Sequence, residues 1–127
     1  MKATESLSFE IRFYEKLLAK HPDFTDVMIA LGDAYTKIGE YKKGLEIDRK
    51  LIKLKKNDET VFYNLACSYA LLEMHNEAFN ALRKSVELGY EDIEHLQKDP
   101  DLQNIRNDKR FKKIVSKIKK KTIPFST

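Results

Sequence analysis

Residues 61–82, VFYNLACSYALLEMHNEAFNAL, hold the single cysteine of this 127-residue chain, Cys67, among tyrosines and a histidine that invite a chemical interpretation. Moved back by 34 residues, the stretch aligns with residues 27–48, VMIALGDAYTKIGEYKKGLEID. Three aligned pairs are Leu65 with Leu31, Ala66 with Gly32, and Tyr69 with Tyr35. Because Cys67 falls on Asp33, the repeat does not require a thiol, and the alignment indicates packing rather than catalysis.

Each aligned unit shows apolar residues at intervals of three and four, which is the pattern of two amphipathic helices. The predicted helices are residues 25–38 and 41–54 in the first unit and residues 59–72 and 75–88 in the second. Gly32 and Ala66 are small enough to let the paired helices approach closely. Gly39 is expected to supply the permissive backbone of the first turn, and Asn76 that of the second.

This pattern resembles the tetratricopeptide repeat, in which Leu-Gly, Tyr, a small residue and a closing proline recur at fixed spacing. The matching residues are Leu31, Gly32, Tyr35 and Gly44 in one unit and Leu65, Ala66, Tyr69 and Ala78 in the other. Neither unit keeps the closing proline or the aromatic residue of the second helix. Residues 6–22 align with the second helices, Tyr14 falling on Asp48 and Leu82, and so resemble a half repeat without its first helix.

Residues 88–118 resemble the segment that closes many bacterial tetratricopeptide arrays, with a Gly, an Asp-Pro-Asp-Leu and an Arg-x-Asp-x-x-Phe. Asp99 and Asp108 are predicted helix N-caps, and Pro100 suits a first helical position. One apolar stripe is formed by Phe111, Ile114, Val115 and Ile118. A final helix carrying this stripe would cover the open apolar edge that the last repeat of a solenoid leaves.

The resemblance implies an all-α fold, a right-handed superhelix of antiparallel helix pairs with about two and a half repeats and C-terminal capping helices. We expect one domain over residues 1–127. Its parts would be a half repeat at 6–22, repeats at 25–58 and 59–92, capping helices at 93–121 and a tail at 122–127. The lack of a signal pattern and of a bilayer-length apolar run predicts a cytoplasmic protein.

In such repeats the first helices line a concave groove, so the resemblance implies an adaptor or scaffold that binds a protein or peptide there. The candidate groove residues are Ile29, Asp33, Thr36, Lys37, Thr60, Tyr63, Asn64, Cys67 and Leu71. Ile29, Tyr63 and Leu71 would anchor apolar side chains, and Asn64 would hydrogen-bond a peptide backbone. Ile29 and Asp33 stand where family members clamp chaperone C-termini with Lys and Asn, so that ligand is disfavoured.

Self-association is the first alternative to groove binding. On a helical wheel, the apolar residues within 7–18 span roughly 200° at about 100° per residue, which is wider than one buried face needs. A second copy of the chain or an upstream repeat would have to cover the excess. The candidate dimer face consists of Leu7, Phe9, Ile11, Phe13 and Leu17.

The charge distribution supplies the second alternative. Residues 1–108 contain 16 Lys and Arg against 20 Asp and Glu, and residues 109–127 contain 8 Lys and Arg without an acid, so the net charges are −4 and +8. Candidate contacts with an anionic surface are Lys112, Lys113, Lys117 and Lys120. Nucleic acid or a membrane surface is the least favoured partner, because the apolar stripe between these lysines is needed to close the array.

The sequence contains no recognisable pattern for catalysis or for a cofactor, so we predict a protein that is not an enzyme. The three histidines are not at ligand spacing with one another or with Cys67, and no metal is expected. The residues three and four positions from Cys67 in its helix include no base. We therefore expect Cys67 to be a small, partly exposed groove residue.

Overall fold

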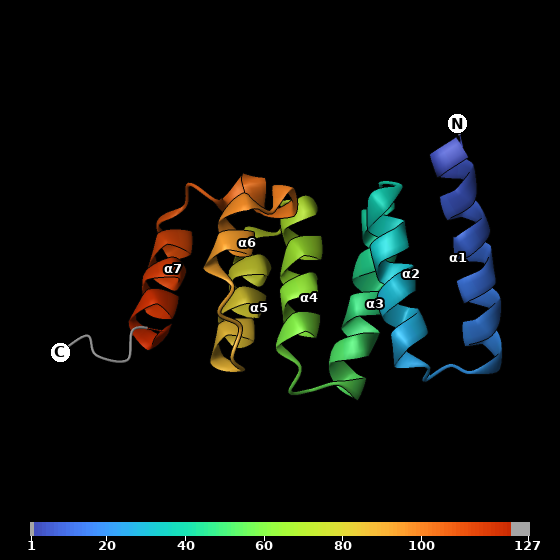
Figure 1. Ribbon diagram of the computed structural model, residues 1–127, viewed down its shortest axis with the longest axis horizontal. Helices are drawn as coiled ribbons and strands as arrows, with labels where there is room; N and C mark the ends of the chain where they lie inside the picture. Colours follow the sequence, from blue (N-terminus) through green and yellow to red (C-terminus); the bar gives the residue numbers. More distant parts are fainter. Residues whose placement is uncertain (1, 123–127) are drawn as a thin grey trace. The chain divides into compact units, whose positions relative to one another are not determined.

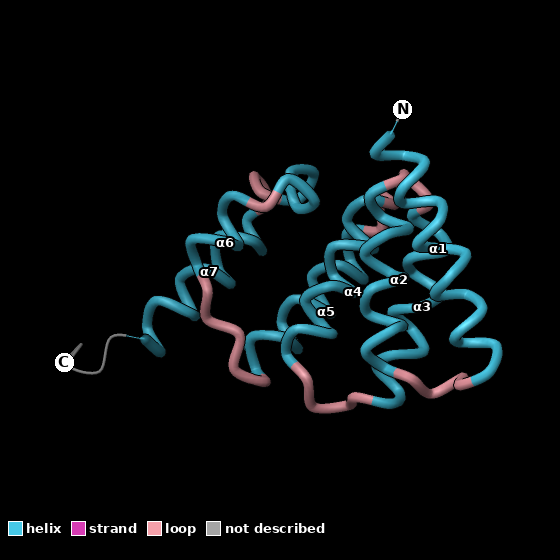
Figure 2. The backbone as a smooth tube through the Cα atoms, turned by 45° about the vertical axis from the view of Figure 1, so that its right-hand side comes forward, coloured by secondary structure: helices cyan, strands magenta, loops and turns pink. Residues whose placement is uncertain are grey.

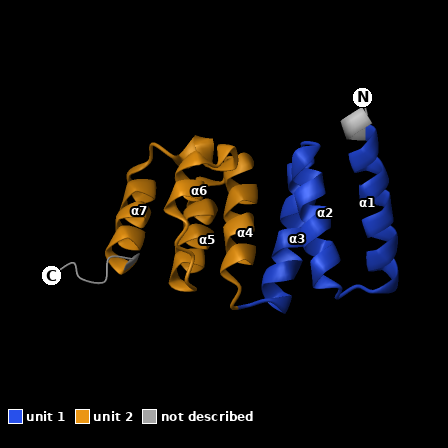
Figure 3. Ribbon diagram, in the orientation of Figure 1, with its two compact units in different colours: residues 1–56 blue, residues 57–127 orange. Residues whose placement is uncertain are grey.

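A computed structural model describes residues 2–122 of the chain and the side chains of residues 5–121. Every regular element in that range is a helix (Figure 1), which confirms the all-α class. The chain divides into two compact units, Met1–Lys56 and Asn57–Thr127 (Figure 3). The single domain expected from the sequence stays a prediction, and the expected tail lies almost entirely outside the described residues.

The first unit consists of α1 (Lys2–Lys20), α2 (Thr25–Lys37) and α3 (Tyr41–Leu54). Figure 2 shows α2 and α3 side by side, joined by a short turn. A Cβ at Gly32 would lie 3.3 Å from Oδ1 of Asp48, and a Cβ at Gly44 would lie 3.3 Å from Oγ1 of Thr36. Since both distances are tighter than ordinary packing, the predicted close approach at Gly32 is confirmed.

α1 packs along α2 and completes the core of the first unit. Ile11 of α1 is buried, as are Val27 and Leu31 of α2. The hydroxyl of Tyr35 donates a hydrogen bond of 2.5 Å to Oε2 of Glu15, and burial together with this carboxylate raises the pKa of Tyr35. This polar contact fixes α1 against α2.

The second unit consists of α4 (Glu59–Leu71), α5 (His75–Glu87), α6 (Ile93–Lys98), the 3-10 helix η1 (Pro100–Ile105) and α7 (Lys109–Thr122). Ala66 of α4 and Ala78 of α5 are fully buried, as are the larger Phe79 and Leu82 of α5. The Ser85 hydroxyl donates to the backbone oxygen of Glu59 at 2.7 Å. None of the helices within residues 2–122 combines the length and apolarity that crossing a membrane requires.

The C-terminal helices begin at the predicted residues. Asp99 accepts from the backbone N–H of Asp101 at 3.0 Å and caps η1, in which Pro100 is the first residue. Asp108 accepts from the backbone N–H of Arg110 at 2.8 Å at the start of α7. The predicted apolar stripe is buried throughout: Phe111, Ile114, Val115 and Ile118. α7 therefore covers apolar surface of its own unit.

The second turn differs from its prediction. Gly39 in the first turn has a positive φ of 83°, as expected, but the corresponding residue of the second turn is Glu73, with φ 62°. Asn76, which was expected to take this role, lies in the first turn of α5. The prediction failed because Asn is a common residue at positive φ, whereas the 34-residue register places Glu73 on Gly39.

Candidate binding surfaces

The face of α1 that points away from α2 carries two large exposed apolar side chains. Phe9 is 67% exposed and Phe13 is 53% exposed. In the 34-residue register, these residues correspond to Lys43 and Ile47 of α3. Exposed phenylalanines at two positions four residues apart form a continuous apolar stripe on a helix.

In α3, the corresponding two positions face α2. The Lys43 Nζ lies 5.7 Å from the centroid of the Tyr35 ring, so this side chain reaches over the first helix of the pair. Ile47 is 9% exposed, and its Cγ2 would lie 3.6 Å from a Cβ at Gly32. α1 therefore exposes Phe13 at the position where α3 buries Ile47, and Phe9 at the position of Lys43, which is itself exposed.

The other members of the candidate dimer face lie closer to the core of the unit. Ile11 is only 8% exposed and packs inside the first unit, so its assignment to a dimer face was wrong. Leu7 and Leu17 are half-buried. Ile11 lies about 200° around the helix from Phe9, which explains why the two residues cannot share one surface.

On α2, the candidate groove residues divide into two groups. Asp33 and Lys37 are exposed and form an ion pair of 2.9 Å, and this carboxylate raises the pKa of Lys37. Ile29 beside them is half-buried. Thr36 donates to the backbone oxygen of Gly32 at 3.1 Å and faces α3, so it is a packing residue rather than part of a groove.

On α4, Tyr63 was expected to anchor an apolar side chain of a ligand, but Tyr90 and Asp99 of the same unit cover it. Tyr63 is 4% exposed, and its hydroxyl donates to Oδ2 of Asp99 at 2.7 Å. Its ring stacks on Tyr90 with centroids 4.5 Å apart and an angle of 9° between the planes. Burial is the main cause that raises the pKa of Tyr63, and burial also raises that of Tyr90 to about 12. The expectation that Tyr63 is available to a ligand is wrong for this structure.

Cys67 is also buried beside Asp99. Its side chain is 7% exposed, and its Sγ lies 3.8 Å from Oδ2 of Asp99. Burial and the neighbouring carboxylates raise the pKa of the thiol well above its ordinary value. The expectation of a partly exposed groove residue is therefore wrong, and the protonated thiol is a poor nucleophile.

The thiol is also part of a cluster with carboxylates. Within residues 2–122, potential ligand atoms of Cys67, Asp99 and Asp101 lie within 4.8 Å of one another. One carboxylate oxygen of Asp99 accepts the Asp101 N–H, and the other accepts the Tyr63 hydroxyl and lies 3.3 Å from Nε2 of His95. The cluster is therefore better suited to joining η1 to α4 than to holding an ion.

The remaining candidates on α4 are more exposed than Tyr63 and Cys67. Thr60 is exposed, whereas Asn64 and Leu71 are half-buried. The amide of Asn104 donates to Oε1 of Glu73 at 2.8 Å and lies 3.4 Å from the backbone oxygen of Ala70. These three α4 residues thus keep partial exposure without forming one open groove with Tyr63.

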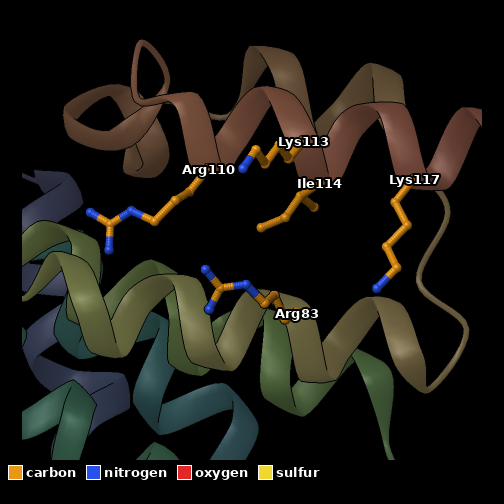
Figure 4. Close-up of a pocket in the computed structure, with 5 residues that line it drawn as sticks. All are labelled: Arg83, Arg110, Lys113, Ile114 and Lys117. Atoms are coloured by element: carbon orange, nitrogen blue, oxygen red, sulfur yellow. The ribbon is translucent and has the colours of Figure 1, made fainter.

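The basic candidates Lys112, Lys113, Lys117 and Lys120 are all exposed on α7. Two of them, Lys113 and Lys117, line a hollow of about 430 Å³ between α5 and α7 (Figure 4). The other lining residues are Arg83, Arg110 and Ile114. The hollow is therefore surrounded by four cationic side chains.

Two of these cations were not predicted as site residues. Arg110 follows a helix N-cap, and its spacing of three and seven residues from Lys113 and Lys117 could have placed it on the same helical stripe. Arg83 belongs to α5, and no sequence signal connects it with α7, because the 34-residue register ends before α7 begins. Only the three-dimensional structure shows that Arg83 lies opposite the lysines of α7.

Both repeat units match a known family and two curated relatives. Residues 25–58 and 60–88 match the family described as "Tetratricopeptide repeat". A chloroplastic protein of Arabidopsis thaliana is 32% identical over 83 residues, which are 63% of this chain and 25% of that protein. Protein CTR9 homolog, also of Arabidopsis thaliana, is 40% identical over 52 residues, or 41% of this chain and 5% of that protein. The chain thus spans a quarter or less of these relatives.

Solved structures show a similar fold. The crystal structure of MamA has a TM-score of 0.75 and 20% identity over 96% of this chain and 70% of the MamA chain. MamA residues 41 to the end from Desulfovibrio magneticus RS-1 have a TM-score of 0.73 and 21% identity, covering 92% of this chain and 64% of the other. At these identities, the likeness supports the helical repeat fold.

Proposed function

This chain belongs to the tetratricopeptide repeat family, and we propose on that basis that it is an assembly scaffold that associates with a second copy of itself through α1. The observation that carries the proposal is the exposure of Phe9 and Phe13. Phe13 stands at the position where α3 packs Ile47 against its first helix, and Phe9 stands at the position of Lys43, whose Nζ lies 5.7 Å from the Tyr35 ring centroid. A helix from another molecule can supply the missing contact on this face.

Covering this face contributes favourably to association. Fully burying an exposed Phe side chain is worth about 1.5–3 kcal/mol, and Phe9 and Phe13 are 67% and 53% exposed, so the four Phe side chains of two molecules provide part of the free energy of a micromolar association. Glu10 stands where α3 has Gly44. A helix that covers α1 must therefore approach less closely than α2 approaches α3, and must leave room for this carboxylate.

The charges around the two phenylalanines favour a second copy over a strongly charged partner. The side chains of residues 5–20 include three acids and three bases: Glu5, Glu10, Glu15, Arg12, Lys16 and Lys20. A neutral surface with an apolar centre and both signs of charge can match an identical surface, as a two-fold interface requires. A highly acidic or basic partner would meet like charges on this helix.

The proposal is tested by the mass in solution, measured by light scattering over a concentration series. The wild-type chain should reach the mass of a dimer as the concentration rises. The double variant Phe9→Ser with Phe13→Ser should stay a monomer, because the apolar centre of the interface is lost. Since both side chains are exposed, the fold of the variant should be retained in circular dichroism.

Leu54→Ser is the matched control, because Leu54 is also a large apolar residue of the first unit and is 45% exposed, but it lies on α3. This variant should dimerise like the wild type. A wild-type chain that stays monomeric throughout the series, or an equal loss of mass in both variants, would show that α1 is not the interface.

Peptide binding on α2 is a second candidate function, and the exposure of Asp33 and Lys37 beside Ile29 favours it. We propose it for α2 alone, because Tyr63 on α4 is covered. Peptides selected against the wild-type protein by phage display should lose binding to the variant Ile29→Ser. The control Thr60→Ala should bind them normally, and unchanged binding to Ile29→Ser would exclude α2.

A further inference from the structure

We infer that the hollow between α5 and α7 is a binding site for an acidic protein segment, in which neighbouring Asp or Glu side chains contact Arg83, Lys113 and Lys117. The site belongs entirely to the second unit. It is independent of the interface proposed for α1. It also differs from a basic helix acting alone, because one of its cations comes from α5.

The first argument is uncompensated charge. Arg110 is paired with Asp108 through an Nη2 to Oδ2 distance of 3.0 Å. Arg83 donates from Nη1 to the neutral side chain of Asn80 at 2.9 Å. Within the part of the chain that the structure describes, no carboxylate pairs with Arg83, Lys113 or Lys117. Three positive charges thus surround one hollow without an acid in its lining.

The second argument is the direction of the side chains. Arg110, Lys113 and Lys117 follow one another at intervals of three and four residues on α7, which places them on one side of the helix. Figure 4 shows Arg110 and Lys117 extending from α7 toward α5, and Arg83 lying on α5 below them. Cations from two helices therefore converge on a shared space, where carboxylates can be contacted from both sides.

The third argument is rigidity at one end of the hollow. The guanidinium of Arg110 lies over the buried ring of Phe79, with Cζ 4.3 Å from its centroid. Its Nη1 also donates to Oδ1 of Asn76 at 2.8 Å. Because these contacts hold Arg110 in place, it can shape the end of the site without losing side-chain freedom on binding.

A second hollow extends the site along α7. Its volume is about 350 Å³, and it is lined by Lys112, Lys113, Ser116, Lys117 and Lys120. Lys113 and Lys117 line both hollows. An extended chain with several acidic residues can therefore contact the first hollow and continue over the outer side of α7.

The apolar side of α7 argues against a membrane surface as the ligand. A helix that lies in a membrane interface needs its apolar face free for the lipid. In α7, Phe111, Ile114 and Ile118 are at most 4% exposed and pack inside the second unit. Lipid headgroups would meet only the lysine side chains.

Nucleic acid is also a poorer match than an acidic protein segment. Proteins that bind single strands commonly stack bases on exposed aromatic rings, and the aromatic ring beneath Arg110, that of Phe79, is fully buried. A duplex is too wide to enter a hollow of about 430 Å³, although it could touch the lysines from outside. A single acidic side chain fits inside.

The test measures fluorescence anisotropy of a labelled peptide with the repeated sequence Asp-Glu-Leu, titrated with the full chain. Arg83→Glu with Lys117→Glu should weaken binding by about tenfold or more, because two attractive contacts become repulsive. The matched control is Lys84→Glu with Lys109→Glu, which changes the same net charge on the same two helices but at residues outside the hollow. It should weaken binding by about twofold or less, as a long-range charge effect alone would do.

Two further probes identify the source of the anionic group. Phosphatidylcholine vesicles containing phosphatidylserine, and a short DNA duplex, should bind more weakly than the peptide at equal ionic strength. The inference is overturned if both double variants weaken peptide binding equally, if the peptide does not bind, or if vesicles or duplex bind more tightly than the peptide. Circular dichroism of each variant verifies that the helices are retained.

Discussion

At the scale of single residues, the carboxylate of Asp99 determines what the second unit exposes. One of its oxygens caps η1, and the other accepts the hydroxyl of Tyr63 from α4. Its backbone oxygen also accepts a hydrogen bond from Arg106. A residue that sequence rules identify as a helix cap thus also closes the surface over Tyr63 and Cys67.

This arrangement predicts that Cys67 reacts slowly. Because the thiol is buried and its pKa is raised, an aromatic disulfide reagent at neutral pH should modify the native chain about 100-fold or more slowly than the urea-unfolded chain. The released thiolate is followed by absorbance. Leu102→Ala should accelerate the native reaction, because Leu102 is fully buried in η1, and the N-cap of η1, Asp99, lies against the thiol. Rapid modification of the native wild type would show that Asp99 and η1 do not shield the thiol from the reagent.

At the scale of helices, α7 depends on the charge of its first cap. Hydrogen bonds from the Arg110 side chain and backbone lower the pKa of Asp108 to about 2 from its ordinary value of 3.8. The folded state therefore holds this proton more weakly than the unfolded state. The ionised Asp108 carboxylate therefore contributes to stability above pH 3.8, and this contribution is lost as the pH falls toward about 2.

Asp108→Asn tests this contribution, because Asn can still cap a helix but has no charge. The free energy of unfolding, measured with urea, should be lower in the variant at pH 6, and the difference from wild type should shrink as the pH falls from about 4 to about 2. Asp92→Asn, at the cap of α6, is a control for the loss of a cap charge elsewhere. A difference that does not depend on pH would contradict the role of the Asp108 charge.

The helices for which both ends could be predicted from the sequence are those with a second copy in the chain. Four of them, α2 to α5, end within one residue of their predicted bounds, because the 34-residue register and the apolar period agree there. The same register would have identified Glu73 as the residue with positive φ. The burial of Tyr63 by Asp99 could not be predicted, because Asp99 lies 36 residues away in a segment that has no counterpart in the repeat.

At the scale of the whole molecule, the two units differ in the size of their cores. Among the described residues, nine large apolar side chains are essentially inaccessible, and only two of them, Leu31 and Leu51, belong to residues 1–56. The other seven are in the second unit: Val61, Phe79, Leu82, Leu96, Leu102, Ile105 and Ile118. The first unit also exposes Phe9 and Phe13, so it should be the less stable of the two.

Hydrogen exchange measured by mass spectrometry tests this difference, because amides exchange through local opening when a unit unfolds at lower cost than the whole chain. Peptides from α2 and α3 should exchange faster than peptides from α4 and α5. Raising the protein concentration into the dimer range should slow exchange in α1 and α2, since association stabilises the unit that contains the interface. The double variant Phe9→Ser with Phe13→Ser is the control and should show no concentration dependence. Equal protection of both units at low concentration would instead mean that residues 1–127 unfold as one cooperative domain, which is the organisation expected from the sequence alone.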